Sequence, residues 1–124
     1  MWDWLKNKMG GKMNVTTLAE RFAVSGQIAP QEVAELAAMG FTDVVCNRPD
    51  VEVAGGPDSA VIGAATMAAG LRFHYMPVSH GPMPQDHAEA LRDLMVSSDA
   101  RVLAYCRSGA RSTALWTLAG SPGR

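Results

Sequence analysis

Two kinds of hydrophobic pattern follow one another along this chain, and they predict short strands and amphipathic helices. Stretches rich in aromatic and β-branched residues, with adjacent apolar positions, are typical of strands within a sheet. Four stretches of this kind predict strands, at residues 21–25, 41–47, 72–78 and 101–105. Apolar residues spaced by three or four positions predict helices. Two segments show this spacing, at residues 30–39 and 84–95. Two further helices are expected, at 59–69, between a capping Asp58 or Ser59 and Gly70, and at 111–119.

The predicted strands and helices alternate as four β–α units, which indicates an α/β fold. We expect a central, mostly parallel sheet of about four to five strands, flanked by helices. In open sheets of this kind, ligands bind at the carboxyl ends of the strands. Cys106 stands at the carboxyl end of the last predicted strand, so we expect the chemistry to lie there.

The first twelve residues differ from the rest, because they contain every lysine of the chain, whereas all later basic residues are arginines. Met13 begins a stretch that resembles a second start, so we divide the chain into an extension, 1–12, and one domain, 13–124. One interpretation of the extension is an interfacial anchor that places Trp2 and Trp4 among lipid headgroups. A helix this short is marginal in water, so we favour a tail without membrane contact.

Composition excludes several classes of function. The chain has 124 residues, of which 48% are hydrophobic and 19% charged, as in ordinary globular domains. A formal net charge of -1 provides no basic field, so we expect no nucleic-acid partner. Two cysteines are too few for a disulfide scaffold or a structural zinc site, and we expect no metal and no cofactor. No secretory signal follows the N-terminal lysines, which predicts a reducing, cytoplasmic location.

The most informative segment runs from Tyr105 to Ser112, where a cysteine leaves a strand and a helix begins a few residues later. We expect Gly109 to take a positive φ, which turns successive amide groups into an anion-binding nest. The N-terminus of the following helix adds partial positive charge, and the Arg111 guanidinium suits an oxyanion. These features favour a thiolate, with a pKa of about 3.5–7.5 rather than about 8.5.

We therefore predict that Cys106 is a nucleophile and that Arg111 is its catalytic partner. The loop between and after them supplies the predicted anion-binding residues, namely Arg107, Ser108, Gly109, Ala110 and Ser112. The Ser112 hydroxyl can either donate a hydrogen bond to the cysteine sulfur or cap the helix. The Arg107 side chain either attracts an anionic substrate or is a solvated loop residue.

Further candidates lie on neighbouring segments. Cys46, near the end of another predicted strand, can resolve an oxidised or persulfidated Cys106 as a disulfide, although packing in the core is the favoured interpretation. Asn47 and Arg48 leave the sheet at the same edge, where they either brace the active loop or shape their own turn. His80 lies in a loop that follows a strand, and it is placed to overhang the Cys106 pocket.

From about Met13 onward, the chain resembles the beta-lactamase-hydrolase-like sulfurtransferase family, which is built on the dual-specificity, tyrosine-phosphatase-like fold. The residues that carry the resemblance are 22–27 (FAVSGQ), 47–50 (NRPD), 77–78 (PV) and 106–112 (CRSGARS). The last segment is the most specific, and it is also similar to the active loop of single-domain rhodaneses. The resemblance implies a tyrosine-phosphatase-like sheet and a role in sulfide, persulfide or thiosulfate metabolism.

The sequence departs from true tyrosine phosphatases in ways that affect the chemistry. Their loop has five residues between cysteine and arginine, whereas Cys106 and Arg111 enclose four. They also use an aspartic acid as general acid, but the corresponding loop, 79–83, contains no carboxylate. Asp86 is the nearest one, and we expect it to be a charge in the first turn of a helix. Without an acid, cleavage of a phosphate ester slows by about 10²–10⁴-fold.

The leading hypothesis is therefore a sulfurtransferase that needs no general acid. Cys106 takes sulfane sulfur from thiosulfate or glutathione persulfide and passes it to a thiol acceptor. Two alternatives stay open, a phosphatase that forms a phosphocysteine at Cys106 and a redox or persulfide sensor without turnover. A persulfide dioxygenase is the partner that the resemblance implies, since some relatives are fused to one.

Overall fold

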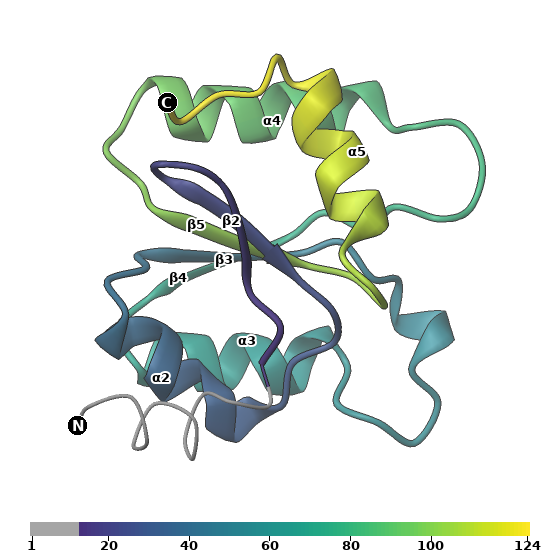
Figure 1. The fold of residues 1–124 in the computed structure, drawn as a ribbon. Coiled ribbons are helices and arrows are strands. Elements are labelled where there is room, and N and C mark those ends of the chain that lie inside the picture. The colour runs from purple at the N-terminus through teal and green to yellow at the C-terminus, as the bar shows by residue number, and fades with distance from the viewer. Residues whose placement is uncertain (1–12) are drawn as a thin grey trace.

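The computed structural model describes residues 13–124 and shows helices packed on both faces of one sheet (Figure 1). The residues of the extension, 1–12, lie outside the described part of the chain, and so does the anchor hypothesis. The elements in chain order are β1 (Thr16–Ala19), β2 (Phe22–Ser25), the 3-10 turn η1 (Pro30–Glu32), α2 (Val33–Ala38), β3 (Asp43–Cys46), the 3-10 turn η2 (Asp50–Glu52), α3 (Ser59–Ala68), β4 (Arg72–Tyr75), α4 (Gln85–Val96), β5 (Val102–Tyr105) and α5 (Ala110–Leu118).

The five strands are arranged in the order β1-β2-β5-β3-β4. The pairs β2–β5, β5–β3 and β3–β4 are parallel, so the prediction of a mostly parallel α/β sheet is confirmed. The sequence analysis missed β1, which is antiparallel to β2 and forms one edge of the sheet. Its residues, Thr16–Ala19, are exposed or half-buried, so they lack the run of buried apolar residues that marks the other three strands around Cys106.

The predicted strand over 72–78 ends earlier, at Tyr75. Pro77 has no N–H for a regular ladder. The chain nevertheless stays against β3, because Met76 N donates to Cys46 O at 2.9 Å and Val78 N donates to Asn47 O at 2.8 Å. This extension of β4 brings residues 76–78 to the carboxyl end of the sheet, where β5 also ends.

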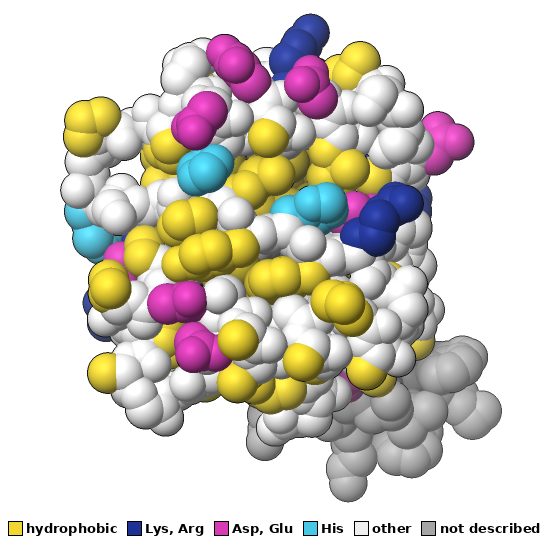
Figure 2. Space-filling view, turned by 180° about the vertical axis from the view of Figure 1, so that it is seen from behind, with side chains coloured by type: hydrophobic (Ala, Val, Ile, Leu, Met, Phe, Trp, Pro, Cys, Tyr) yellow, Lys and Arg dark blue, Asp and Glu magenta, His cyan; other side chains and the backbone are white. Residues whose placement is uncertain are grey.

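Side chains of the sheet alternate between two cores, as expected for buried parallel strands. Val102 and Ala104 of β5 belong to the core under α4 and α5. Leu103 and Tyr105 belong to the other core, under α2 and α3. Figure 1 shows these helix pairs on opposite faces of the sheet. The α3 segment carries no charged residue, and its Met67 side chain is 69% exposed. Figure 2 shows apolar side chains gathered across one face of the molecule.

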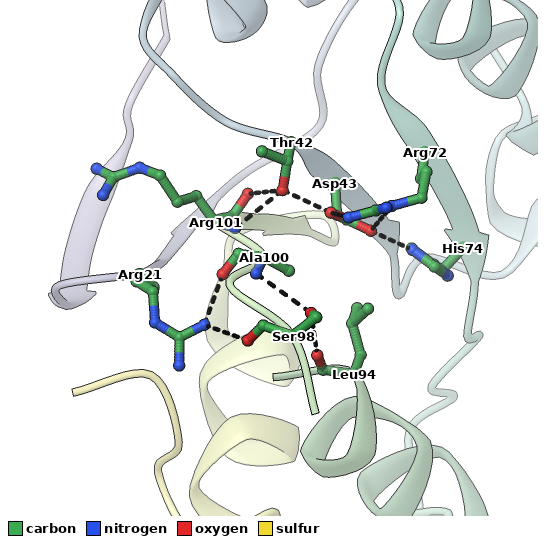
Figure 3. Close-up of polar contacts among 9 residues, drawn as sticks. All are labelled: Arg21, Thr42, Asp43, Arg72, His74, Leu94, Ser98, Ala100 and Arg101. Atoms are coloured by element: carbon green, nitrogen blue, oxygen red, sulfur yellow. Dashed lines mark hydrogen bonds and ion pairs between the residues drawn. The ribbon is translucent and has the colours of Figure 1, made fainter. Parts of the chain in front are cut away.

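A polar cluster joins the amino ends of β3 and the edge strand β4 (Figure 3). The fully buried Asp43 carboxylate accepts hydrogen bonds from Arg72 at 2.9 and 3.0 Å and from Thr42 at 2.6 Å, and it lies 2.7 Å from His74 Nε2. Burial alone raises the pKa of Asp43, but these contacts outweigh it and hold that pKa below its usual value. The cluster therefore pins β3 to β4 at the edge far from Cys106.

Within residues 13–124, none of the helices has the length and apolar character needed to span a bilayer.

Candidate active site

Cys106 is the first residue beyond β5, and it is buried at the carboxyl edge of the sheet. Its backbone N–H donates to Ser25 O of the adjacent strand at 3.3 Å, which anchors the start of the loop. Gly109 has a φ of +94°, as predicted, and precedes the first residue of α5. This left-handed conformation turns the chain back, so that Gly109 N–H donates to Cys106 Sγ at 3.0 Å.

The loop stabilises the charged form of the cysteine. Burial raises the pKa of the Cys106 thiol, but hydrogen bonds from the backbone N–H groups of Ser112, Ser108, Arg111 and Gly109 outweigh this effect. The pKa of Cys106 is consequently lowered from its usual value. Backbone amides and a helix N-terminus therefore provide the positive potential, as expected for an anion-binding nest.

The Ser112 side chain makes neither of the two contacts expected from the sequence. Gly109 occupies the cap position of α5, so no side chain caps this helix. The Ser112 hydroxyl is buried and has no hydrogen-bond partner among the described residues. Ser112 thus acts on Cys106 through its backbone N–H. The side chains of Arg107, Ser108 and Ala110 are exposed at the rim of the loop.

Arg111 is held by two supports. Its Nη1 and Nη2 donate to the two oxygens of Glu52 at 2.8 Å each, and Nη1 also donates to Val78 O at 2.7 Å. A guanidinium has five N–H groups, so Nε–H and one Nη2–H stay available on one edge. That edge is the one that binds an oxyanion through two parallel hydrogen bonds. Glu52 and, to a smaller extent, Cys106 raise the pKa of Arg111.

Glu52 is the site residue that the sequence analysis missed, since it lies in none of the predicted strands or helices. It ends the η2 turn and is separated from Arg111 by 59 residues. The Arg111 guanidinium lowers the pKa of Glu52. The sequence held one signal of this role. Arg48 and Glu52 have opposite charges and lie four residues apart, soon after β3, which pairs with β5. Their ion pair, at 3.6 Å, is the local part of a larger network.

Within the described residues, neither the Asn47 nor the Arg48 side chain donates a hydrogen bond directly to the cysteine loop. Asn47 Nδ2 donates to Met76 O at 2.8 Å, which holds the segment that presents Val78 O to Arg111. Arg48 Nη2 donates to Glu52 O at 3.1 Å and so shapes its own turn. Its Nη1 also reaches across to Gln27 Oε1 at 3.1 Å, outside that turn.

Cys46 is packed in the core and does not face Cys106. It is the register partner of Tyr105, and both lie in the core under α2 and α3. Cys106, which lies beyond the end of β5, is not a member of that core. Burial raises the pKa of Cys46, whose thiol donates to Arg48 O at 3.3 Å. This placement agrees with the packing interpretation and gives no support to a Cys46–Cys106 disulfide.

His80 and Asp86 lie at the periphery. His80 is exposed. Arg111 is the main cause of the lowered pKa of Glu52, burial opposes it, and the nearby His80 adds a smaller lowering effect. Asp86 lies in the first turn of α4, as expected, and its carboxylate accepts a hydrogen bond from His87 N at 2.9 Å. Neither side chain has a hydrogen bond to the Cys106 loop within the described residues. No group of three or more metal-ligating side chains occurs there either.

A cysteine with a lowered pKa at the carboxyl edge of this sheet, followed at once by an amide nest and an arginine, defines a cysteine-based enzyme of the tyrosine-phosphatase-like class. Residues 14–122 match the family model described as beta-lactamase hydrolase-like protein, phosphatase-like domain, and the chain belongs to this family. This confirms the beta-lactamase hydrolase-like family and the tyrosine-phosphatase-like fold, whereas the sulfurtransferase and rhodanese-like parts of the resemblance stay predictions.

Curated relatives include beta-lactamase hydrolase-like proteins of Xylella fastidiosa and Agrobacterium fabrum, each 29% identical over 106 residues. The match covers 86% of this chain and 25% of those proteins, so the chain spans about a quarter of their length.

Among solved structures, a "putative phosphatase" from Neisseria meningitidis is 35% identical, with a TM-score of 0.75 over 85% of this chain and 75% of that one. Another from Shewanella putrefaciens is 21% identical, with a TM-score of 0.76 over 91% of this chain and 74% of that one. Kinase associated phosphatase, at 11% identity and a TM-score of 0.67, covers 88% of this chain and 76% of its own, and shares the fold.

Proposed function

We propose that this protein is a sulfurtransferase that carries sulfane sulfur on Cys106, from a small anionic donor such as thiosulfate or glutathione persulfide to a thiol. One observation carries the proposal: among the residues that the structure describes, the site combines a stabilised thiolate with no carboxyl group that is free to donate a proton. The carboxyl group that contacts the active arginine is Glu52, and its pKa is lowered by Arg111. At neutral pH Glu52 is therefore an ion-pair partner rather than an acid.

The need for an acid separates the two chemistries that this fold supports. Cleavage of a phosphate ester expels an alkoxide or phenoxide, and protonation of that leaving group contributes about 10²–10⁴-fold to the rate. Sulfur transfer from thiosulfate expels sulfite, which is a stable anion. The loop with four residues between Cys106 and Arg111 also provides one amide fewer than the five-residue loop of phosphatases. Both features favour sulfur transfer.

In the proposed first step, the Cys106 thiolate attacks the outer sulfur of thiosulfate. A sulfur–sulfur bond forms, the original one breaks, and sulfite leaves with the electron pair. The product, a Cys106 persulfide anion, keeps the negative charge that the amides of Ser108 and Gly109 stabilise in the thiolate. In the second step, an acceptor thiolate attacks the outer sulfur, takes it as a new persulfide and regenerates the Cys106 thiolate.

Two further expectations belong to this proposal. The product is a low-molecular-weight persulfide, so we propose a persulfide dioxygenase as the partner that consumes it. A free thiolate nucleophile suits a reducing compartment, which agrees with the proposed cytoplasmic location.

The test is the intact mass of the reduced protein after incubation with thiosulfate or glutathione persulfide. We expect a gain of one sulfur atom that cyanide removes. Cys106→Ser should show no gain, and Cys46→Ser is the matched control that should behave like the wild type. A wild-type protein that gains no sulfur from either donor would contradict the proposal.

The second candidate function is a phosphatase, and the family description together with the Neisseria meningitidis structure favours it. Here the Cys106 thiolate attacks phosphorus, the ester oxygen leaves, and water then hydrolyses the phosphocysteine. Without a general acid, the enzyme should cleave p-nitrophenyl phosphate, whose leaving group is a stable anion, but scarcely cleave alkyl phosphates. Two results together would establish the phosphatase: the protein hydrolyses phosphotyrosine and Cys106→Ser abolishes this activity, and the wild type forms no Cys106 persulfide with either sulfur donor.

A further inference from the structure

We propose that Arg48 is a positioning residue, which holds Glu52 in the orientation that leaves one edge of the Arg111 guanidinium free for an anion. The inference deepens the proposed function and rests on it in one respect, that the free edge of Arg111 binds the anionic part of the substrate. It goes beyond the bracing of a turn, because it assigns Arg48 an effect on Arg111, although the two side chains share no hydrogen bond.

The first step of the argument is that Glu52 is not fixed by its own backbone. It ends the three-residue η2 turn, and such short 3-10 segments have poor hydrogen-bond geometry. The preceding residue, Val51, is 90% exposed, so the turn projects from the surface without a packed side chain at its tip. Something outside the turn must therefore determine where the Glu52 carboxylate points.

Arg48 supplies that constraint, because it faces both the backbone oxygen and the carboxylate of Glu52. Its Nη2 donates to the Glu52 backbone oxygen at 3.1 Å, and its Nε lies 3.6 Å from Glu52 Oε1. The Arg48 side chain is only 16% exposed, so water screens these contacts weakly. The hydrogen bond fixes the Glu52 backbone, and the Arg48 charge attracts the carboxylate that Arg111 binds, so Arg48 restrains both parts of Glu52.

Arg48 also connects this turn to the segment behind the cysteine loop. Its Nη1 donates to Gln27 Oε1 at 3.1 Å, and Gln27 Nε2 donates to Ile28 O at 2.9 Å. The neighbouring Gly26 packs so closely on the loop that an added Cβ would lie 2.9 Å from Arg107 O. Arg48 therefore fixes Glu52 relative to the loop that carries the nucleophile, and not merely relative to β3.

The consequence for Arg111 follows from its number of donors. Glu52 and Val78 O together take three N–H groups, which leaves the edge formed by Nε and Nη2. A Glu52 carboxylate that is free to rotate can occupy that edge instead, and it would then compete with the anion. Loss of Arg48 should consequently weaken anion binding while the amide-stabilised thiolate of Cys106 is retained.

The experiment measures how well inorganic sulfate protects Cys106 from alkylation by iodoacetamide, read by mass spectrometry. The key variant is Arg48→Lys, which keeps the charge but loses the planar fork. We expect about tenfold weaker protection by sulfate, in the range by which neighbouring residues couple, with an unchanged pH dependence of alkylation. Arg101→Lys, at an exposed position at the other edge of the sheet, is the matched control and should match the wild type.

A double-mutant cycle completes the test. In a Glu52→Gln background, Arg48→Lys should change protection by less than about twofold, because no carboxylate is left to be oriented. Full protection in Arg48→Lys, or additive effects of the two substitutions, would show that Arg48 contributes only charge and would overturn the proposal. Gln27→Ala removes the same link from its other end and should cause a smaller loss, even if Arg48→Lys reduces the yield of folded protein.

The outcomes also separate this inference from the proposed function. A coupled cycle in a protein that gains no sulfur from thiosulfate supports the role of Arg48 and rejects sulfur transfer. A wild-type protein that sulfate does not protect rejects the anion site at Arg111, and the role of Arg48 with it.

Discussion

The two ends of the central strands carry similar ion pairs that serve different purposes. At the amino edge, the carboxylate of Asp43 is fully buried while the Arg72 side chain is 63% exposed (Figure 3). At the carboxyl edge, Arg111 is only 12% exposed and its partner Glu52 is 23% exposed. In the first pair the buried carboxylate is saturated by donors, and in the second Arg111 keeps two donors beyond those that Glu52 and Val78 use. A surplus of donors beside a thiolate indicates a binding site, whereas a balanced network indicates a structural one.

The largest effect that this comparison predicts is on catalysis at the carboxyl edge. Arg111→Ala should lower kcat/KM for thiosulfate by about 10²–10³-fold, since it removes preorganised donors from the site of developing charge. Arg72→Ala, the corresponding change at the amino edge, should leave kcat/KM within about twofold. Steady-state kinetics of the two variants check this, and an equal loss in both would mean that the comparison is wrong.

The next effect is on stability at the amino edge. Asp43→Ala should reduce the free energy of unfolding by about 3 kcal/mol, because it breaks a buried charged network that joins β3 to β4. The Cys106 loop lies at the opposite edge, so the folded variant should still be alkylated at the wild-type rate. Urea denaturation monitored by tryptophan fluorescence gives the first quantity. A variant as stable as the wild type would show that the cluster contributes little.

A smaller effect concerns the close packing behind the cysteine loop. Gly26→Ala places a methyl group 2.9 Å from Arg107 O, and overpacking of this kind typically costs about 1–3 kcal/mol. It should also slow alkylation of Cys106, because the loop must shift. Gly70→Ala is the matched control, since its φ is +84° but nothing lies within 4 Å of the added carbon. That variant should lose about 1–2 kcal/mol of stability and keep the wild-type alkylation rate.

The smallest effects are those of pH, and they differ at the two edges. The pKa of Asp43 is lowered by folding, so its contribution to stability is present above the pKa of the unfolded chain and is lost as pH falls through the folded value. The free energy of unfolding should therefore decrease in acid, and Asp43→Asn should flatten that decrease. Denaturation curves between pH 3 and pH 7 measure it.

At the carboxyl edge, the pKa of Cys106 is lowered in the same direction, but the measurable quantity is reactivity. The rate of alkylation should stay high below the usual thiol pKa of about 8.5 and fall only as pH passes through the lowered value. Cys106→Ser reports the background from Cys46, whose pKa is raised by burial. An alkylation midpoint at or above the usual value would contradict the amide-stabilised thiolate.

Much of the fold was predictable, because strands and helices leave local patterns. The four β–α units and the positive φ of Gly109 follow from periodicity and from the tight turn between Cys106 and Arg111. The short strand β1 was missed, because an edge strand with half-exposed residues lacks the apolar run that marks a buried one. Its pairing with β2 depends on a tight hairpin and not on a hydrophobic pattern.

The sequence by itself determined the amide nest around Cys106, the proposed nucleophile, since the cysteine and these amides are neighbours along the chain. Only the tertiary structure decided which residues hold Arg111. Glu52 reaches Arg111 because β3 lies beside β5, and Val78 does so because the end of β4 follows β3. Contacts between residues 59 and 33 positions apart depend on strand order, and local patterns in a sequence carry no record of that order.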